Sequence, residues 1–267
     1  MRFLFALLLV TSLFAQERRI LVVTASSGDY IFGAGGTLAK FIREGWRVDV
    51  AQFGNDEKQS LGLTQAQTRL ANVQEGKAAA KLLGVKDTVN MDFKSGEIAY
   101  VSTTEMRNQL FALIRGIRPQ IIFIPDPYVH YQDDSDLINV GRMAEEAWGY
   151  SSGAMFGNEL TRMGLKPYGA PEVFFYAPYR PYRKGEGGAG RAKFVAIDVA
   201  ETIEHKLGAL ELLLTHNRTW VANRTSLQPD QSVSAYVRAF ATEMAKTIGA
   251  KHGFQFGEEF NHVGPRR

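Results

Sequence analysis

The sequence predicts an α/β fold, a Rossmann-like, doubly wound and mostly parallel sheet flanked by helices. Short apolar runs rich in β-branched residues, such as 20–23 and 121–124, are typical of strands buried on both faces. These runs alternate with longer segments of helical spacing, and repeated strand–helix units favour a parallel sheet with right-handed crossovers. With 267 residues, 45% of them hydrophobic, the chain is long enough for one large domain.

The first half of the chain has the clearest pattern. Strands are predicted at residues 20–23, 47–53, 89–91 and 121–124, and helices at 37–44, 64–83, 103–117 and 135–148. After the first strand, residues 26–29 form a polar loop and Gly33 to Gly36 are expected to form a glycine turn, because glycine allows positive φ and close approach of the backbone. A loop at this end of a parallel strand is where open α/β sheets bind ligands.

The second half is less regular. Residues 149–192 are rich in Gly, Tyr and Pro, and we expect an irregular lid or insertion over the ligand edge of the sheet, or a surface excursion. A strand candidate lies within it at 172–176. A strand at 193–197 and helices at 201–214 and 232–248 then complete a domain that spans residues 17–267.

Residues 1–16 are predicted to be a signal peptide. The stretch MRFLFALLLVTSLFA has one basic residue, a compact apolar run and a small residue at a possible cleavage point. It is too short to span a membrane, so no transmembrane segment is expected in the mature form. The alternative is an apolar N-terminal helix or strand. The prediction is an exported protein, periplasmic or secreted.

The composition of the chain excludes several classes of functional site. The chain has no cysteine, which excludes disulfides, thiolate nucleophiles and cysteine zinc sites. Its formal charge of +3 comes from well-mixed charges, and the sequence has no basic stripe that would indicate nucleic-acid binding. A small-molecule or carbohydrate ligand is the expected partner, and the sequence leaves the oligomeric state open.

The stretch RILVVTASSGDYIFGAGGTLAK, residues 19–40, resembles the opening motif of the PIG-L/LmbE-like family of zinc-dependent N-deacetylases. There a strand runs into Ala-His-Pro-Asp-Asp-Glu and then Gly-x-Gly-Gly. Residues that resemble later family landmarks follow in order at 82–85, 95–97, 134–142, 216–219 and 257–260. The resemblance implies a hydrolase that removes N-acetyl groups from an amino sugar or glycoconjugate.

Most chemical positions of the motif are replaced. The family's zinc ligands, as the resemblance implies, are the first His and second Asp of the opening motif and the second His of a later His-Pro-Asp-His; these fall on Ser26, Asp29 and Leu137. The family's base falls on Gly28, and a substrate-contacting Asp falls on Ser95. A hydrolytic zinc site needs roughly three His or carboxylate ligands and a base. Asp29 is then only a remnant, and we expect no zinc here and loss of the family mechanism.

Two functional classes remain open. The first is an exported hydrolase of the deacetylase family that acts through an unusual site. The second is a catalytically inactive relative, a pseudoenzyme that keeps the cleft to bind carbohydrate or a protein partner.

A rebuilt metal site is the alternative to a lost one. His130, Asp133, Asp134 and Asp136 form a dense cluster after the fourth strand, which Asp29 could face. Such hard ligands suit Mg²⁺, Ca²⁺ or Mn²⁺. The competing interpretation is that Asp134 caps the following helix and the other acids favour its N-terminus.

Aromatic residues in the irregular segment, with Tyr150 and Tyr179 among them, would suit a sugar ring, because they combine apolar faces with polar tips. They could equally anchor the segment to the core. His216 could cap the helix before it or contact a ligand, whereas no partner is evident in the sequence for His252 and His262.

Overall fold

The computed structural model describes residues 17–58, 60–129, 132–183, 193–226 and 232–265. Within these residues the sheet has seven strands in the order β3-β2-β1-β4-β5-β7-β6. The strands are β1 (Arg19–Thr24), β2 (Arg47–Gly54), β3 (Asp87–Phe93), β4 (Ile121–Pro125), β5 (Glu172–Tyr176), β6 (Lys193–Asp198) and β7 (Gly257–Val263). Neighbours from β3 to β5 pair in parallel, and β7 pairs antiparallel with both β5 and β6. The predicted α/β, mostly parallel sheet is confirmed.

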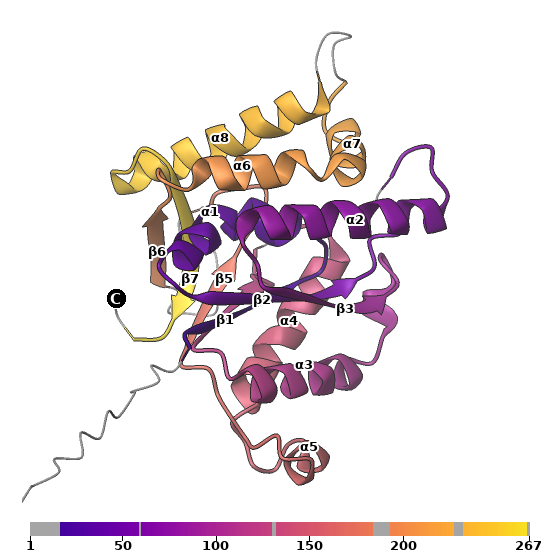
Figure 1. Ribbon diagram of the computed structural model, residues 1–267, viewed down its shortest axis with the longest axis vertical. Helices are drawn as coiled ribbons and strands as arrows, with labels where there is room; N and C mark the ends of the chain where they lie inside the picture. Colours follow the sequence, from indigo (N-terminus) through magenta and orange to yellow (C-terminus); the bar gives the residue numbers. More distant parts are fainter. Residues whose placement is uncertain (1–16, 59, 130–131, 184–192, 227–231, 266–267) are drawn as a thin grey trace, which may run out of the picture.

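Helices cover both faces of the sheet. They are α1 (Asp29–Arg43), α2 (Gln65–Leu83), α3 (Thr103–Ile117), α4 (Ser135–Tyr150), α5 (Asn158–Arg162), α6 (Ile203–Glu211), α7 (Leu214–Ala222) and α8 (Val233–His252), with a short 3₁₀ turn, η1 (Ile98–Tyr100). Figure 1 shows α1, α2, α6, α7 and α8 on one face and α3 and α4 on the other. Each face has its own buried apolar cluster, so alternate residues of the same strands serve two cores.

The expected glycine turn is wrong. Helix α1 already begins at Asp29, and Gly33, Gly35 and Gly36 lie inside it. A Cβ on Gly33 would lie 2.5 Å from Cδ2 of Tyr176, and one on Gly36 would lie 2.9 Å from Cβ of Val199. The glycines therefore allow α1 to pack against β5 and the segment after β6, and no positive φ is needed.

Two further predictions need correction. The single helix expected over 201–214 ends at Glu211, and α7 starts a new helix at Leu214. Strand β7 was not expected, because its sequence GEEFNHV is polar. It is buried because its polar groups are paired. Glu258 accepts hydrogen bonds from Gly36 N, Thr37 N and Lys206 Nζ.

The described part of the irregular segment contacts the sheet at both the amino and the carboxyl ends of its strands. Near the amino edge, Tyr168 Oη donates to the carbonyl of Pro119, 2.9 Å away. The buried guanidinium of Arg115 donates to four carbonyls of the loop 151–157, which fixes that loop beside α3. After β5, Tyr179 and Tyr182 lie at the carboxyl edge, where Tyr182 Oη donates to Asp126 Oδ2 at 3.0 Å.

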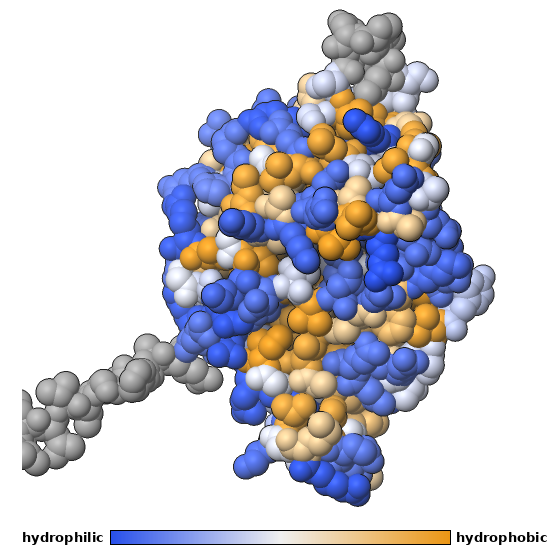
Figure 2. Space-filling model, turned by 45° about the vertical axis from the view of Figure 1, so that its right-hand side comes forward, coloured by the Kyte–Doolittle hydropathy of each residue, from blue (hydrophilic) through white to orange (hydrophobic). Residues whose placement is uncertain are grey.

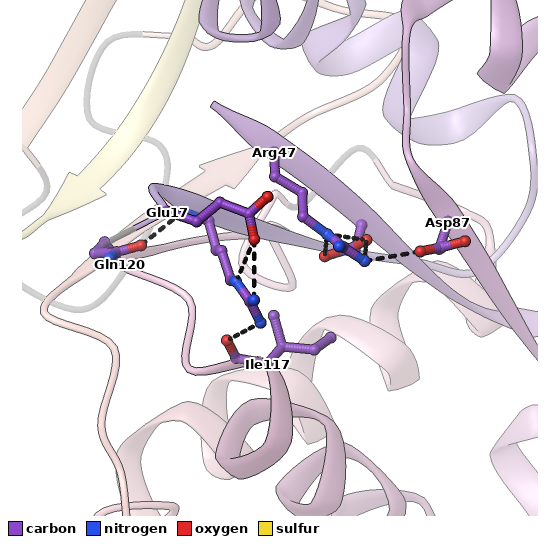
Figure 3. A network of polar contacts seen from close by, with 7 residues as sticks. Glu17, Arg47, Asp87, Ile117 and Gln120 are labelled. Carbon is purple, nitrogen blue, oxygen red and sulfur yellow. Dashed lines mark hydrogen bonds and ion pairs between the residues drawn. The ribbon is translucent and has the colours of Figure 1, made fainter. Parts of the chain in front are cut away.

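A polar network ties the amino ends of the strands together (Figure 3). Arg19 N donates to Gln120 Oε1 at 2.6 Å, which links β1 to β4. Arg47 of β2 donates to Asp49 on its own strand and to Asp87 Oδ2 of β3 at 2.7 Å. These contacts set the strand register at the edge opposite to the cleft described below.

The predicted signal peptide, residues 1–16, and the glycine-rich tip 184–188 lie outside the described residues. Among the helices that the structure describes, none is long and apolar enough to cross a membrane.

Candidate ligand-binding cleft

A cleft opens where the strand order reverses. The loops after β1 and β4 meet there, and α7 closes one side. Its cavity is about 180 Å³. The lining residues are Gln132, Asp133, Asp134, Tyr179, His216, Thr219, Trp220, Asn223 and Arg224.

Asp29 lies beneath this cleft at the first position of α1 and is only 2% exposed. Its two carboxylate oxygens are already engaged: Oδ2 accepts from Ser26 N and Oδ1 accepts from Tyr179 Oη, both at 2.9 Å. Burial, and then the negative charge of Asp134, raise the pKa of Asp29 to about 7. The carboxyl group therefore keeps its proton to a higher pH than an ordinary aspartate does.

Two more carboxyl groups oppose its ionisation. Asp56, after β2, accepts from Ser27 N at 3.1 Å, and burial raises its pKa to about 6. Asp134 Oδ1 caps α4 by accepting from the backbone N–H groups of Asp136 and Leu137. Partial enclosure of its carboxyl group, with the charge of Asp136, raises the pKa of Asp134. The cleft thus holds negative charge that a bound cation or hydrogen-bond donor would relieve.

His216 occupies the place next to Gly28. A Cβ built on Gly28 would lie 2.8 Å from Nε2 of His216, so the imidazole fills the space that a side chain at position 28 would enter. Burial, and then the charge of Arg224, lower the pKa of His216 to about 4, which keeps the ring neutral at physiological pH. His216 reaches this place because it lies within α7, a new helix, and its side chain lines the cleft.

Aromatic rings form the outer wall. Tyr179 and Trp220 stack with centroids 5.6 Å apart, and the guanidinium of Arg224 lies over Trp220 at 4.4 Å and over Tyr179 at 5.3 Å. Within the described residues, Trp220 Nε1 and Thr219 Oγ1 are buried without a hydrogen-bond partner. Such groups cost free energy unless a ligand or water satisfies them.

The structure brings together some of the predicted site residues. Ser26, Gly28, Asp29, Asp134 and Tyr179 meet at the cleft, and Asp133 lines it. Asp56, Trp220 and Arg224 were not predicted. Asp56 lies in a polar stretch directly after β2, and that position at the carboxyl end of a strand is the sequence signal that could have pointed to it.

Other predicted residues lie elsewhere. Leu137 is buried in the apolar cluster beneath α4, and Asp136 accepts from Gly96 N and Ile98 N, so it fixes the turn 95–98. Ser95 Oγ accepts from Asp56 N at 2.8 Å and so supports the cleft indirectly. Tyr150 stacks on Phe156 and lines a separate surface hollow. His130 lies outside the described residues.

The donor set at the family's metal position does not fit zinc. Asp29 already accepts two protein hydrogen bonds, Ser26 offers a neutral hydroxyl and Leu137 is in the core. Within the part of the chain that the structure describes, no group of three or more His, Cys, Asp or Glu side chains could hold a metal ion. The acidic cluster after β4 is likewise divided, since Asp134 caps α4 and Asp136 faces a different turn.

Fold and cleft define a Rossmann-like α/β protein with a polar site at the switch point of its sheet. Residues 21–148 match the family model PIG-L, GlcNAc-PI de-N-acetylase. Over these residues the chain is similar to that family, and the resemblance to the PIG-L/LmbE-like family noted in the sequence is confirmed.

Individual proteins support the same assignment. The chain is 27% identical to diacetylchitobiose deacetylase of Thermococcus kodakarensis over 202 residues, which is 74% of this chain and 69% of that protein. The N,N'-diacetylchitobiose deacetylase of Pyrococcus horikoshii shares the fold with a TM-score of 0.77, at 22% identity over 94% of this chain and 85% of that one. The 4-carboxy-2-hydroxymuconate hydratase of Pseudomonas putida also shares it, with a TM-score of 0.69, 19% identity and coverage of 94% and 98%. The fold therefore hosts more than one chemistry.

Proposed function

We propose that this protein is an exported PIG-L-domain protein that binds a carbohydrate in the cleft beside Asp29 and has lost zinc-dependent deacetylation. The observation that carries the proposal is the contact between Gly28 and His216. The position of the family's base has no side chain, and an imidazole with a pKa of about 4 fills the adjacent space. At Asp29, both carboxylate oxygens accept hydrogen bonds from protein groups.

The lining of the cleft supports a sugar ligand. Tyr179 and Trp220 line the cleft, and aromatic side chains there offer apolar contact to a sugar ring. Asn223, Arg224 and the carboxyl of Asp134 line the cleft and offer hydrogen bonds to hydroxyl or acetamido groups. Since two of the similar proteins are named for diacetylchitobiose, an N-acetylated amino sugar is the first ligand to test.

A second candidate is hydrolysis without zinc, in which the Asp29 and Asp134 carboxyl groups act as acid and base. One arrangement favours it: Asp29 lies beneath the cleft that Asp134 lines, and burial together with the charge of Asp134 raises the pKa of Asp29 toward neutrality.

The experiment uses the mature chain, residues 17–267. Its metal content is measured by mass spectrometry, N,N'-diacetylchitobiose is titrated by calorimetry, and acetate release is followed at pH 7. Binding without zinc or acetate release supports the first proposal. Binding should weaken at least about tenfold in Trp220→Ala and stay unchanged in Tyr100→Ala, which alters a tyrosine that is 88% exposed.

The remaining outcomes decide against it. Stoichiometric zinc together with acetate release would overturn the non-catalytic proposal, and absence of saturable binding would overturn the carbohydrate ligand. Acetate release without metal, abolished in Asp29→Asn, would support the acid–base alternative instead. Export is tested separately by cell fractionation after expression of the full chain. Recovery of the protein in the cytoplasm with residues 1–16 still attached would contradict it.

A further inference from the structure

A surface hollow lies on the outer side of helix α4, separate from the cleft described above. Tyr128, which follows β4, forms one wall, and α4 residues between Arg142 and Tyr150 form the rest. The volume of the hollow is about 470 Å³, within the roughly 300–1,000 Å³ of small-molecule sites. We refer to it as the α4 hollow.

Three aromatic side chains line the α4 hollow and reach the surface. Tyr128 and Tyr150 are 44% and 47% exposed, and Trp148 is partly exposed. Figure 2 shows hydrophobic residues beside hydrophilic ones in the lowest part of the molecule, where α5 lies and toward which α4 runs in Figure 1. A single exposed aromatic residue is ordinary, whereas several gathered in one hollow mark a binding surface.

Contacts with the protein hold each of these rings in place. Tyr128 Oη donates to Glu145 Oε2 at 2.5 Å, and Trp148 Nε1 donates to a backbone carbonyl before β5 at 2.8 Å. Tyr150 stacks on Phe156 with centroids 4.8 Å apart. Because the rings are already ordered, a ligand that contacts them loses little side-chain entropy on binding.

The space between the rings is open and has a polar rim. A Cβ built on Gly149, which lines the hollow, would meet nothing within 4 Å. Arg142 is exposed and forms no ion pair with another residue that the structure describes, so its N–H groups can donate to a ligand. A sugar has an apolar ring face for aromatic contact and hydroxyl groups for Arg142. A purely apolar ligand would instead bury this charge without a hydrogen bond.

Helix α4 connects the α4 hollow to the cleft. Asp134 caps the start of α4 and lines the cleft, whereas Glu145 lines the hollow three turns later, about 16 Å along the helix axis at 1.5 Å per residue. A glycan of several sugars can span this separation. When one ligand occupies two sites, the second contact is intramolecular, so two weak sites together give a much higher affinity.

We propose that the α4 hollow is a second carbohydrate subsite, which holds one sugar of a glycan chain whose other end occupies the cleft. The choice of an N-acetylated amino sugar for this chain rests on the proposed function of the cleft. The ligand of the protein is then a polymeric glycan, bound more tightly than a disaccharide.

The test titrates N,N'-diacetylchitobiose and the hexamer of N-acetylglucosamine into the mature protein, residues 17–267, by calorimetry. The hexamer should bind at least about tenfold more tightly than the dimer. Tyr150→Ala removes one ring and Gly149→Leu fills the open space, and each should remove most of this gain while dimer binding stays unchanged. Tyr100→Ala, at a tyrosine in η1 that is 88% exposed, is the matched control and should keep the gain.

Absence of hexamer binding, equal affinity for dimer and hexamer, or a gain that persists in both Tyr150→Ala and Gly149→Leu would overturn the subsite. The dimer titration reports on the cleft, so its failure counts against the proposed function. Hexamer binding that is lost in Tyr150→Ala but unchanged in Trp220→Ala would support the α4 hollow and contradict the carbohydrate cleft. Circular dichroism at the assay temperature confirms that each variant is folded.

Discussion

A Cβ atom on Gly28 would lie 2.8 Å from Nε2 of His216, although Gly28 directly precedes α1 and His216 lies in α7, far along the chain. A side chain at position 28 would fit only if the His216 side chain were absent or moved away. The glycine at position 28 and the imidazole beside it therefore distinguish this cleft from the pattern implied by the family motif.

Gly28→Ala should destabilise the fold by about 1–3 kcal/mol, because the new methyl group overpacks against the buried imidazole. Urea denaturation measures the change. The matched control is Gly149→Ala in α4, where nothing lies within 4 Å of the added Cβ and alanine should stabilise the helix by about 1 kcal/mol. In the double variant Gly28→Ala/His216→Ala the losses should be less than additive. An unchanged midpoint for Gly28→Ala would contradict the packing described.

In Asp29→Asn, the stability of the protein should depend less on pH between about pH 4 and pH 7 than it does in the unmodified protein. In the folded state the pKa of Asp29 is raised to about 7 from its usual 3.8, so the folded protein binds more protons than the unfolded chain across this window. Stability from this group is present at low pH and is lost as pH rises through about 7. Thermal midpoints of both proteins from pH 4 to pH 8 measure it, and parallel curves would contradict the assignment.

His216→Gln should change the pH dependence of stability in the opposite direction. The pKa of His216 is lowered to about 4 from 6.5, so the unfolded chain binds more protons and stability falls as pH drops from 6.5 toward 4. The variant should lose part of this acid sensitivity. His205→Gln, at an exposed histidine, is the control and should retain it. Equal acid sensitivity in both variants would show that His216 is not the group that resists protonation.

Lys206→Met should cost about 3–5 kcal/mol, because it leaves Glu258 buried without its cation. Lys206 and Glu258 are 0% and 1% exposed, and Lys206 Nζ also donates to the carbonyl of Phe32 at 2.7 Å. Chemical denaturation measures the loss, which Lys206→Met/Glu258→Gln should partly restore. Glu204→Gln breaks an exposed ion pair with Arg238 and should change stability by less than about 1 kcal/mol. A comparable cost for both variants would contradict the role of burial.

The sequence predicted those elements whose cause is local. Helix α3 and strand β5 have the bounds that the pattern indicated, because an apolar period and nearby stop signals set them. Strand β7 could not be predicted this way. Its burial depends on Lys206 for Glu258 and on Glu172 for His262, partners 52 and 90 residues away.

The residues of the candidate site also divide into those that local sequence predicts and those that only folding brings together. The loop after the first strand was predicted from local pattern, and Asp29 follows it at the first position of α1. Tyr179 reaches Asp29 across 150 residues, and Asp56 reaches Ser27 across 29. The histidines illustrate the limit too, since His252 and His262, for which no partner was evident, contact Glu259 and Glu172. Only the folded chain brings such groups together.

Strand β7 lies between β5 and β6, both of which precede it in the chain. During synthesis on the ribosome, β5 and β6 are therefore complete while the strand that separates them is still missing. A nascent chain stalled before Gly257 would expose two unsatisfied strand edges, a state prone to intermolecular pairing. Assembly of this side of the domain must wait for translation to pass Val263, so frameshifts upstream of this strand should yield aggregates in place of a shortened, folded product.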